Sequence, residues 1–133
     1  MKTTFFTRWI LIVAVIFSFA SCKKNETKEE MYPAVTLSPE QQQLALGEEL
    51  FKGVGNCFSC HLPEKKVIGP SIKEIAQIYK DQNADMVTFL KGKGKPIVDP
   101  SQYEVMRANF IITKNMTDEQ LQAIDAYMMS FLK

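Results

Sequence analysis

Residues 57–61 of the chain read Cys-Phe-Ser-Cys-His and follow directly on a glycine-rich turn. Cys57 and Cys60 are separated by about one helical turn, and an imidazole stands immediately after the second thiol. His61 is the only histidine among the 133 residues, and the only cysteine outside this motif is Cys22. The chain therefore has too few cysteines and histidines for a framework of several disulfides or for a zinc site of four such ligands.

The spacing of the motif is that of a covalent haem c attachment site, CxxCH. Two thiols about one helical turn apart can each form a thioether with a different vinyl group, and the histidine that follows then faces the iron. We therefore expect Cys57 and Cys60 to hold one haem c and His61 to bind its iron. A redox-active CxxC pair of the thioredoxin type is the alternative, but no strand precedes this motif, as a βαβ unit would require.

The N-terminus has the layout of a bacterial signal peptide. Basic residues precede an apolar run of about a dozen residues, whereas a helix that crosses a bilayer needs about 20. Residues 19–22, Phe-Ala-Ser-Cys, resemble a lipobox, in which the signal is cut before the cysteine and the cysteine is acylated. We expect residues 1–21 to be a lipoprotein-type signal peptide and Cys22 to carry lipid. A permanent membrane span and a soluble exported protein with a spare thiol are the alternatives.

Composition favours a single domain after this leader. Residues 22–36 are charged and lack apolar periodicity, which predicts a flexible, lipidated tether. Residues 37–133 then form one domain, because 133 residues with 46% hydrophobic content are too few for two independent cores. The 16 basic and 15 acidic residues include no block of like charge that could grip a nucleic-acid backbone, so a nucleic-acid partner is not expected.

Two capping boxes mark the ends of the predicted helical domain. Residues 38–41, Ser-Pro-Glu-Gln, are typical of a helix start, and apolar residues at spacings of three and four give residues 39–52 one apolar face. A second capping box over residues 117–120 begins a final helix that is expected to run almost to Lys133.

The middle of the chain predicts shorter helices joined by long loops. Apolar spacing indicates a helix from Ile72 to Tyr79 and another over residues 83–91, stopped by Gly92. Residues 99–101, Asp-Pro-Ser, indicate a turn or a helix start that leads towards Met106, and Met106 itself is expected in a non-periodic loop. No alternating apolar and polar run of useful length is present, so the predicted fold class is all-α.

At this point the sequence resembles the class I monohaem cytochromes c, in the form of a bacterial lipoprotein, over residues 37–133. Gly47 and Phe51 in the first predicted helix and Tyr127 in the last resemble the glycine and aromatic residues at which the terminal helices of that family cross. The resemblance implies a small all-α cytochrome c fold with crossed N- and C-terminal helices around a covalently attached haem. An ordinary amphipathic helix core would produce the same pattern.

The resemblance also implies how the histidine is held. Residues 68–70, Ile-Gly-Pro, resemble the family segment whose proline carbonyl accepts a hydrogen bond from the proximal histidine and so determines its tautomer. Pro70 would be that residue for His61. A Gly-Pro pair that simply begins a helix is the alternative.

The resemblance further implies a methionine as the second axial ligand, well downstream of the motif. Met106 stands where the family commonly has methionine followed by proline, although here arginine follows. Met116 is the competing candidate. Because Met116 directly precedes the Thr117 cap, a hydrophobic staple with Leu121 accounts for it without a ligand role.

Ligation by His61 and Met106 leaves the iron six-coordinate, so single-electron transfer without bond chemistry is the function expected. The chain would act in an exported electron-transfer chain, lipid-anchored on the periplasmic or outer face of a bacterial membrane, as a monomer. Its partners would be redox proteins such as a terminal oxidase or a haem reductase. A haem enzyme or a gas or redox sensor with an open distal position is one alternative, and a non-haem binding module with an accidental motif is another.

Charge along the chain is uneven. Between residues 57 and 95 there are seven lysines and four acidic residues, while acidic side chains gather in the last helix and its cap. Such asymmetry would orient an exposed haem edge towards an acidic partner. A solvated loop over residues 91–95, Lys-Gly-Lys-Gly-Lys, explains the lysines equally well.

Overall fold

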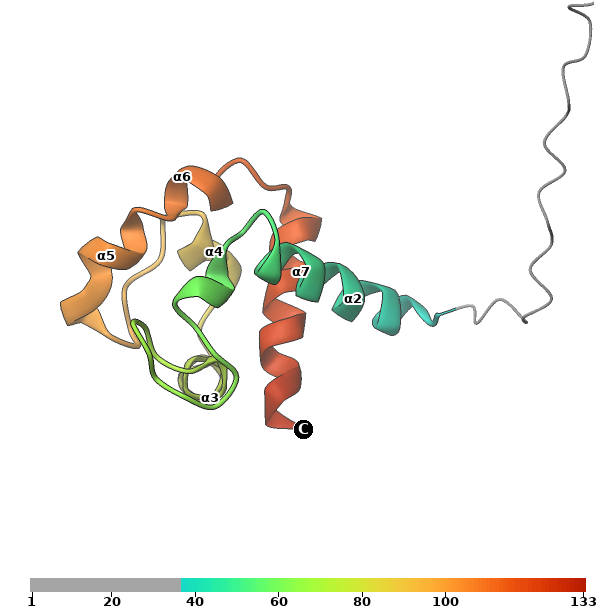
Figure 1. Cartoon of the computed structure of the whole chain (residues 1–133), viewed down its shortest axis with the longest axis horizontal. Helices are drawn as coiled ribbons and strands as arrows, with labels where there is room; N and C mark the ends of the chain where they lie inside the picture. Colours follow the sequence, from blue (N-terminus) through green and yellow to red (C-terminus); the bar gives the residue numbers. More distant parts are fainter. Residues whose placement is uncertain (1–36) are drawn as a thin grey trace, which may run out of the picture. The chain divides into compact units, whose positions relative to one another are not determined.

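Residues 37–133 are described by the computed structural model shown in Figure 1, whereas the predicted signal peptide, Cys22 and the tether lie outside the described residues. The described part is built from helices, with one isolated bridge between His61 and Lys66 and no strand, so the predicted all-α class is confirmed. None of these helices is long and apolar enough to cross a membrane. In chain order they are α2 (Pro39–Lys52), η2 (Cys57–Ser59), α3 (Ile72–Asp81), α4 (Met86–Leu90), η3 (Pro100–Gln102), α5 (Tyr103–Arg107), α6 (Phe110–Thr113), α7 (Asp118–Met129) and η4 (Ser130–Leu132).

Both predicted capping boxes are present at the starts of α2 and α7. The Ser38 hydroxyl accepts a hydrogen bond from the backbone N–H of Gln41, and the Gln41 side chain accepts one from the backbone N–H of Ser38. Thr117 and Gln120 make the same reciprocal pair before α7. Each box satisfies two backbone donors that a helix start leaves without intrahelical partners.

The two terminal helices cross in close contact (Figure 1). Gly47 of α2 lies against the backbone of α7, where a Cβ at this position would overlap the Ala123 carbonyl and come within 2.7 Å of the Tyr127 Cβ. One turn further along α2, the fully buried Phe51 packs on Tyr127, with ring centroids 5.4 Å apart. Glycine is therefore required at position 47 to let the helices approach, and the crossing implied by the resemblance is present.

The core lies between α7 and the shorter helices. From α3, one face buries Ile72, Ile75, Ala76 and Tyr79. The remaining buried apolar residues of the core cluster come from α2, η2, α4 and α7: Leu50, Phe51, Cys57, Met86, Leu90, Leu121, Ile124 and Met128. Because each short helix contributes only a few of these side chains, α7 is the element on which the others depend for burial.

The helix expected over residues 83–91 is shorter than predicted. Asn83 has a positive φ of 47°, which ends the preceding turn, and α4 begins only after Asp85, whose carboxylate accepts the backbone N–H of Thr88 at 3.0 Å. A second hydrogen bond from the Thr88 hydroxyl is the main reason that the pKa of Asp85 lies below its ordinary value. Gly92, with φ of 73°, follows the helix as the sequence predicted.

The prediction of a loop around Met106 is wrong, because Met106 lies in α5. This helix is five residues long and α6 is four, too short for an apolar period to show in the sequence. Tertiary contacts hold them instead. The buried Thr113 hydroxyl donates to the Leu90 carbonyl at 2.6 Å and so joins α6 to α4.

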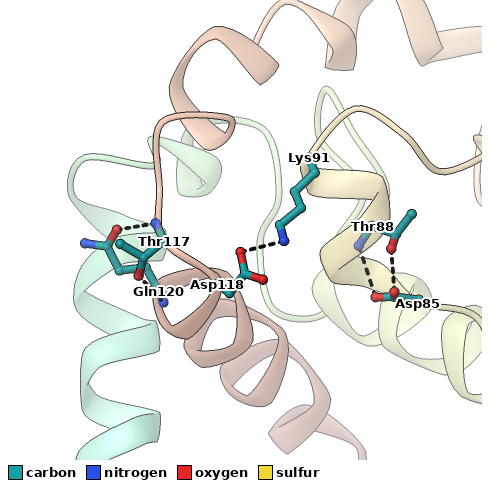
Figure 2. A network of polar contacts seen from close by, with 6 residues as sticks. All are labelled: Asp85, Thr88, Lys91, Thr117, Asp118 and Gln120. Carbon is teal, nitrogen blue, oxygen red and sulfur yellow. Dashed lines mark hydrogen bonds and ion pairs between the residues drawn. The ribbon is translucent and has the colours of Figure 1, made fainter.

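A surface ion pair connects the same region to the last helix (Figure 2). Lys91, at the end of α4, lies 2.5 Å from the Asp118 carboxylate at the first position of α7. Figure 2 also shows the capping pair Thr117 and Gln120 beside it. An exposed pair of this kind contributes at most about 1 kcal/mol, so it adds little to the contact between α4 and α7.

Replacing Gly47 by Ala tests the crossing. The added Cβ forces α2 away from α7, which we expect to lower the free energy of unfolding by about 1–3 kcal/mol, the range for overpacked sites. Chemical denaturation of the haem-loaded protein measures this. Gln43→Ala, at an exposed position of the same helix, should stay within about 0.5 kcal/mol of the parent protein. Equal stability of the Gly47→Ala and Gln43→Ala variants would contradict the requirement for glycine.

Candidate functional site

The turn after α2 brings the motif together. Gly55 donates its backbone N–H to the Leu50 carbonyl at 2.8 Å, and Asn56 adopts a left-handed conformation with φ of 50°. The chain then turns through η2, where the Cys57 carbonyl accepts the backbone N–H groups of both Cys60 and the following residue. Because of this turn, both thiols and the imidazole of the motif line one cavity.

Burial sets the chemistry of the first thiol. Cys57 is 8% exposed, and desolvation raises the pKa of its thiol to about 11. A redox-active CxxC pair needs the opposite shift, because the thiolate is the nucleophile. The thioredoxin-like alternative is therefore disfavoured by this environment as well as by the absence of a preceding strand among residues 37–133.

The imidazole of His61 is held by the segment that the resemblance identified. Its Nδ1 atom lies 2.7 Å from the carbonyl oxygen of Pro70. Since a carbonyl oxygen only accepts, Nδ1 carries the proton, and Nε2 keeps the lone pair that a metal ion requires.

Gly69 also lies against the imidazole ring of His61. Its backbone N–H donates to the Cys60 carbonyl at 3.0 Å. A Cβ on Gly69 would overlap the His61 ring and lie 2.8 Å from Nδ1, so the loop can pass this close to the imidazole only without a side chain. The hydrogen bond to Pro70 and the contact with Gly69 together hold the His61 ring in one orientation.

The cavity beside the motif has a volume of about 340 Å³ and an almost wholly apolar wall. This volume lies within the range typical of cofactor sites. The haem that the motif predicts is a largely apolar plate, which would be tied covalently to Cys57 and Cys60 and would face His61. The residues that line the cavity fit such a group. Besides the motif, the wall includes Phe51, Asn56, Ser59, Ile68, Gly69, Pro70, Ile75, Tyr79, Met86, Phe89, Leu90, Pro96, Ile97, Val98, Asp99, Gln102, Tyr103, Val105, Met106, Ala108, Asn109, Ile124 and Met128.

Three methionines line this cavity, and they differ in how they are held. Met86 and Met128 are 3% and 5% exposed and belong to the core cluster, so packing accounts for them. Met106 is half-buried, lies on α5 and packs against the edge of that cluster. Met116 does not line the cavity and lies instead beside a group of lysines. The structure thus brings Met106, and not Met116, to the same cavity as His61.

Several residues of the cavity wall were not identified from the sequence. Asn109 donates its side-chain amide to the Gly55 carbonyl at 3.0 Å, joining the segment after Met106 to the turn before Cys57. Phe89 and Tyr103 also line the cavity, and both pack against Phe110 behind it. No local signal could have found them, because their partners lie far away in the sequence.

Comparisons with known proteins identify the family that the chain matches. A family model described as cytochrome c matches residues 44–131, which include the whole motif, Pro70 and Met106. A protein called cytochrome c-552 from Nitrosomonas europaea is 50% identical over 40 residues. That match covers 30% of this chain and 38% of the relative, so it spans less than half of either protein.

Gly69→Ala tests how the imidazole is held. The added methyl group pushes the His61 ring or the loop aside, so we expect the Nδ1–Pro70 hydrogen bond to lengthen and the free energy of unfolding to fall by about 1–3 kcal/mol. The NMR shift of the Nδ1 proton and a denaturation curve measure the two effects. Val67→Ala, at an exposed position of the same loop, is the control and should leave the proton shift unchanged. An unchanged shift in Gly69→Ala would show that the loop does not orient the ring.

Proposed function

The chain belongs to the cytochrome c family and carries covalently bound haem c, and on this premise we propose that it is a single-electron carrier with His61 and Met106 as axial ligands. The match to the cytochrome c family and the similarity to cytochrome c-552 support haem-based electron transfer. One observation carries the finer proposal: Cys57, Cys60, His61 and Met106 all line the same cavity. When bound, the haem supplies an iron that alternates between the ferric and ferrous states and so carries one electron.

The chain's own residues would each have a distinct task in this proposal. Cys57 and Cys60 form the thioether bonds that tie the plate to the turn. His61 would bind the iron through Nε2, and its hydrogen bond to the Pro70 carbonyl keeps the ring in that tautomer. Met106 would bind the iron through its thioether sulfur, which would favour the ferrous state more than a second imidazole would.

The apolar wall supports a carrier rather than a catalyst. Buried side chains from α4 and α7, including Leu90, Ile124 and Met128, exclude water from the cavity and lower the local dielectric. With two protein ligands there is no open position for oxygen or substrate. A haem enzyme or a gas or redox sensor needs that open position, and the chain has no second histidine to assist peroxide chemistry.

Met106→Ala tests the axial ligand. Ligation by methionine gives class I cytochromes c a weak far-red absorption band in the ferric state. We expect this band to disappear in Met106→Ala, and the reduced protein to bind carbon monoxide, because the distal position is then open. Met116→Ala is the matched control and should keep the band, with a free energy of unfolding lower by roughly 1–2 kcal/mol for a half-buried side chain.

Two results would overturn the assignment. If the band persists in Met106→Ala and is lost in Met116→Ala, Met116 is the ligand. If the parent protein in its reduced form already binds carbon monoxide and lacks the band, the distal position is open and the sensor or enzyme alternative holds.

We propose further that the protein is exported and lipid-anchored through Cys22. The support is the signal-peptide layout of residues 1–21, the lipobox-like residues 19–22, and the typical export of family members. In bacteria, covalent haem attachment takes place outside the cytoplasm, which agrees with export. The lipid would hold the domain on the periplasmic or outer face of a membrane, within reach of redox partners such as a terminal oxidase or a haem reductase, with the protein itself acting as a monomer.

Mass spectrometry of the mature protein tests the anchor. We expect an N-terminus at Cys22 that carries acyl chains, because several chains give the stable anchoring that a single chain does not. Cys22→Ala should lose membrane retention and keep its haem, since the domain does not use this cysteine. A mature N-terminus at another residue, or an unmodified Cys22, would exclude the lipid anchor.

A further inference from the structure

The helix that carries Met106, α5, has no fully buried residue. On either side of it, one polar contact reaches across to the segments around the haem motif. After the helix, the Asn109 side chain donates to the main chain just before the motif. Before the helix, Asp99 pairs with Lys66 of the loop that follows the motif. We call residues 99–109 the Met106 segment, and its position depends more on these contacts at its ends than on burial of α5 itself.

The ion pair at the start of this segment joins parts of the chain that are 33 positions apart in the sequence. The Lys66 ammonium lies 3.3 Å from one carboxylate oxygen of Asp99. Asp99 lines the haem cavity, and its side chain is 21% exposed, against 60% for that of Lys66. The pair therefore links the loop after the motif to the Met106 segment beside the cavity.

Both partners of the pair are held by their own segments. The second carboxylate oxygen of Asp99 accepts the Ser101 hydroxyl at 2.6 Å. This hydrogen bond, together with the ammonium of Lys66, holds the pKa of Asp99 below its ordinary value, so the carboxylate is charged at neutral pH. On the other side, an isolated β-bridge aligns the backbone of Lys66 with that of His61. Because the carboxylate is already held, less side-chain entropy is lost when the pair forms.

The pair separates whenever the Met106 segment moves away from the loop. A small ligand can replace Met106 on the iron only if this segment moves aside. The free energy of the pair therefore adds to the cost of this local opening, which is smaller than the cost of global unfolding. An exposed ion pair is weak, but a weak contact matters for a helix that buries no side chain of its own.

We propose that Lys66 and Asp99 are positioning residues, which hold the Met106 segment against the loop after the motif and so keep small exogenous ligands from replacing the Met106 thioether on the iron. The proposal rests on the proposed function, because it concerns how the axial ligand assigned there is kept in place. A closed set of ligands distinguishes an electron carrier from a haem enzyme or sensor, which needs an open position.

Imidazole titration of the ferric protein tests this proposal. The parent is the haem-loaded full chain with Cys22→Ala, which has no acylation site. Loss of the far-red band reports the replacement of Met106. At about pH 8 imidazole is neutral, so the removal of a nearby charge does not by itself change its affinity. Asp99→Asn and Lys66→Gln should each raise the association constant of imidazole about three- to fivefold, which corresponds to about 0.6–1 kcal/mol.

Two further variants separate the pair from a general loss of charge. The double variant Lys66→Gln, Asp99→Asn should bind imidazole no more tightly than either single variant, because each change removes the same interaction. Glu64→Gln is the matched control. Glu64 is exposed and lies in the same loop, but it pairs with Lys73 of α3, 3.7 Å away, and not with the Met106 segment. This variant should keep the imidazole affinity of the parent.

Salt provides a test on the parent alone. Because salt screens exposed charges, the imidazole affinity of the parent should rise towards that of the variants as salt is added. The affinity of the double variant should change little, since it lacks the pair.

Equal affinity of the parent and both single variants, with no effect of salt on the parent, would refute the role of the pair. An increase in Glu64→Gln as large as that in Asp99→Asn would refute it as well, because loss of any charge in the region would then be sufficient. Failure of the proposed function gives a different result. A parent that lacks the far-red band has no methionine ligand, whereas a parent that has the band and is unaffected by these variants disproves only the positioning role.

Discussion

The close approach of α2 and α7 at Gly47 is the constraint on which the rest of the structure depends. Without a Cβ at this position the two helix backbones meet, and Phe51 can bury itself against Tyr127. α2 ends one residue after Phe51, at Lys52, and the turn that carries Cys57 starts only a few residues later. α7 in turn supplies Ile124 and Met128 to the buried face against which the short helices pack. The haem cavity therefore takes part of its wall from the same crossing.

Contacts between segments that are far apart in the sequence complete the haem cavity. The Pro70 carbonyl orients His61 across the loop after the motif, and Asn109 ties the segment after Met106 to Gly55. Thr113 holds α6 on α4 through the Leu90 carbonyl. Each of these bonds uses a backbone carbonyl as acceptor, so the positions of the proposed ligands depend on the path of the main chain more than on neighbouring side chains.

The surface of the folded domain does not keep the charge pattern that is counted along the sequence. Counted along the sequence, lysines outnumber acidic residues over residues 57–95, a pattern that an acidic partner and a solvated loop explain equally well. In the folded domain Lys66 is neutralised by Asp99, and Lys91 is bound to Asp118. Charge segregation along a chain becomes charge segregation on a surface only where folding keeps the like charges together, and folding pairs these two lysines with acidic residues instead.

The sequence by itself determined the local features of this protein: both capping boxes, the bounds of α2, the all-α class, and the motif at Cys57, Cys60 and His61. These depend on residues within a few positions of one another, whose hydrogen bonds and spacing are visible in the chain. Only the tertiary structure decided that Met106 lies on a short helix and that it shares the cavity of His61 while Met116 does not. The physical reason is that helices of one turn are held by distant partners, such as the Leu90 carbonyl for α6, and such partners leave no periodic signal in the sequence.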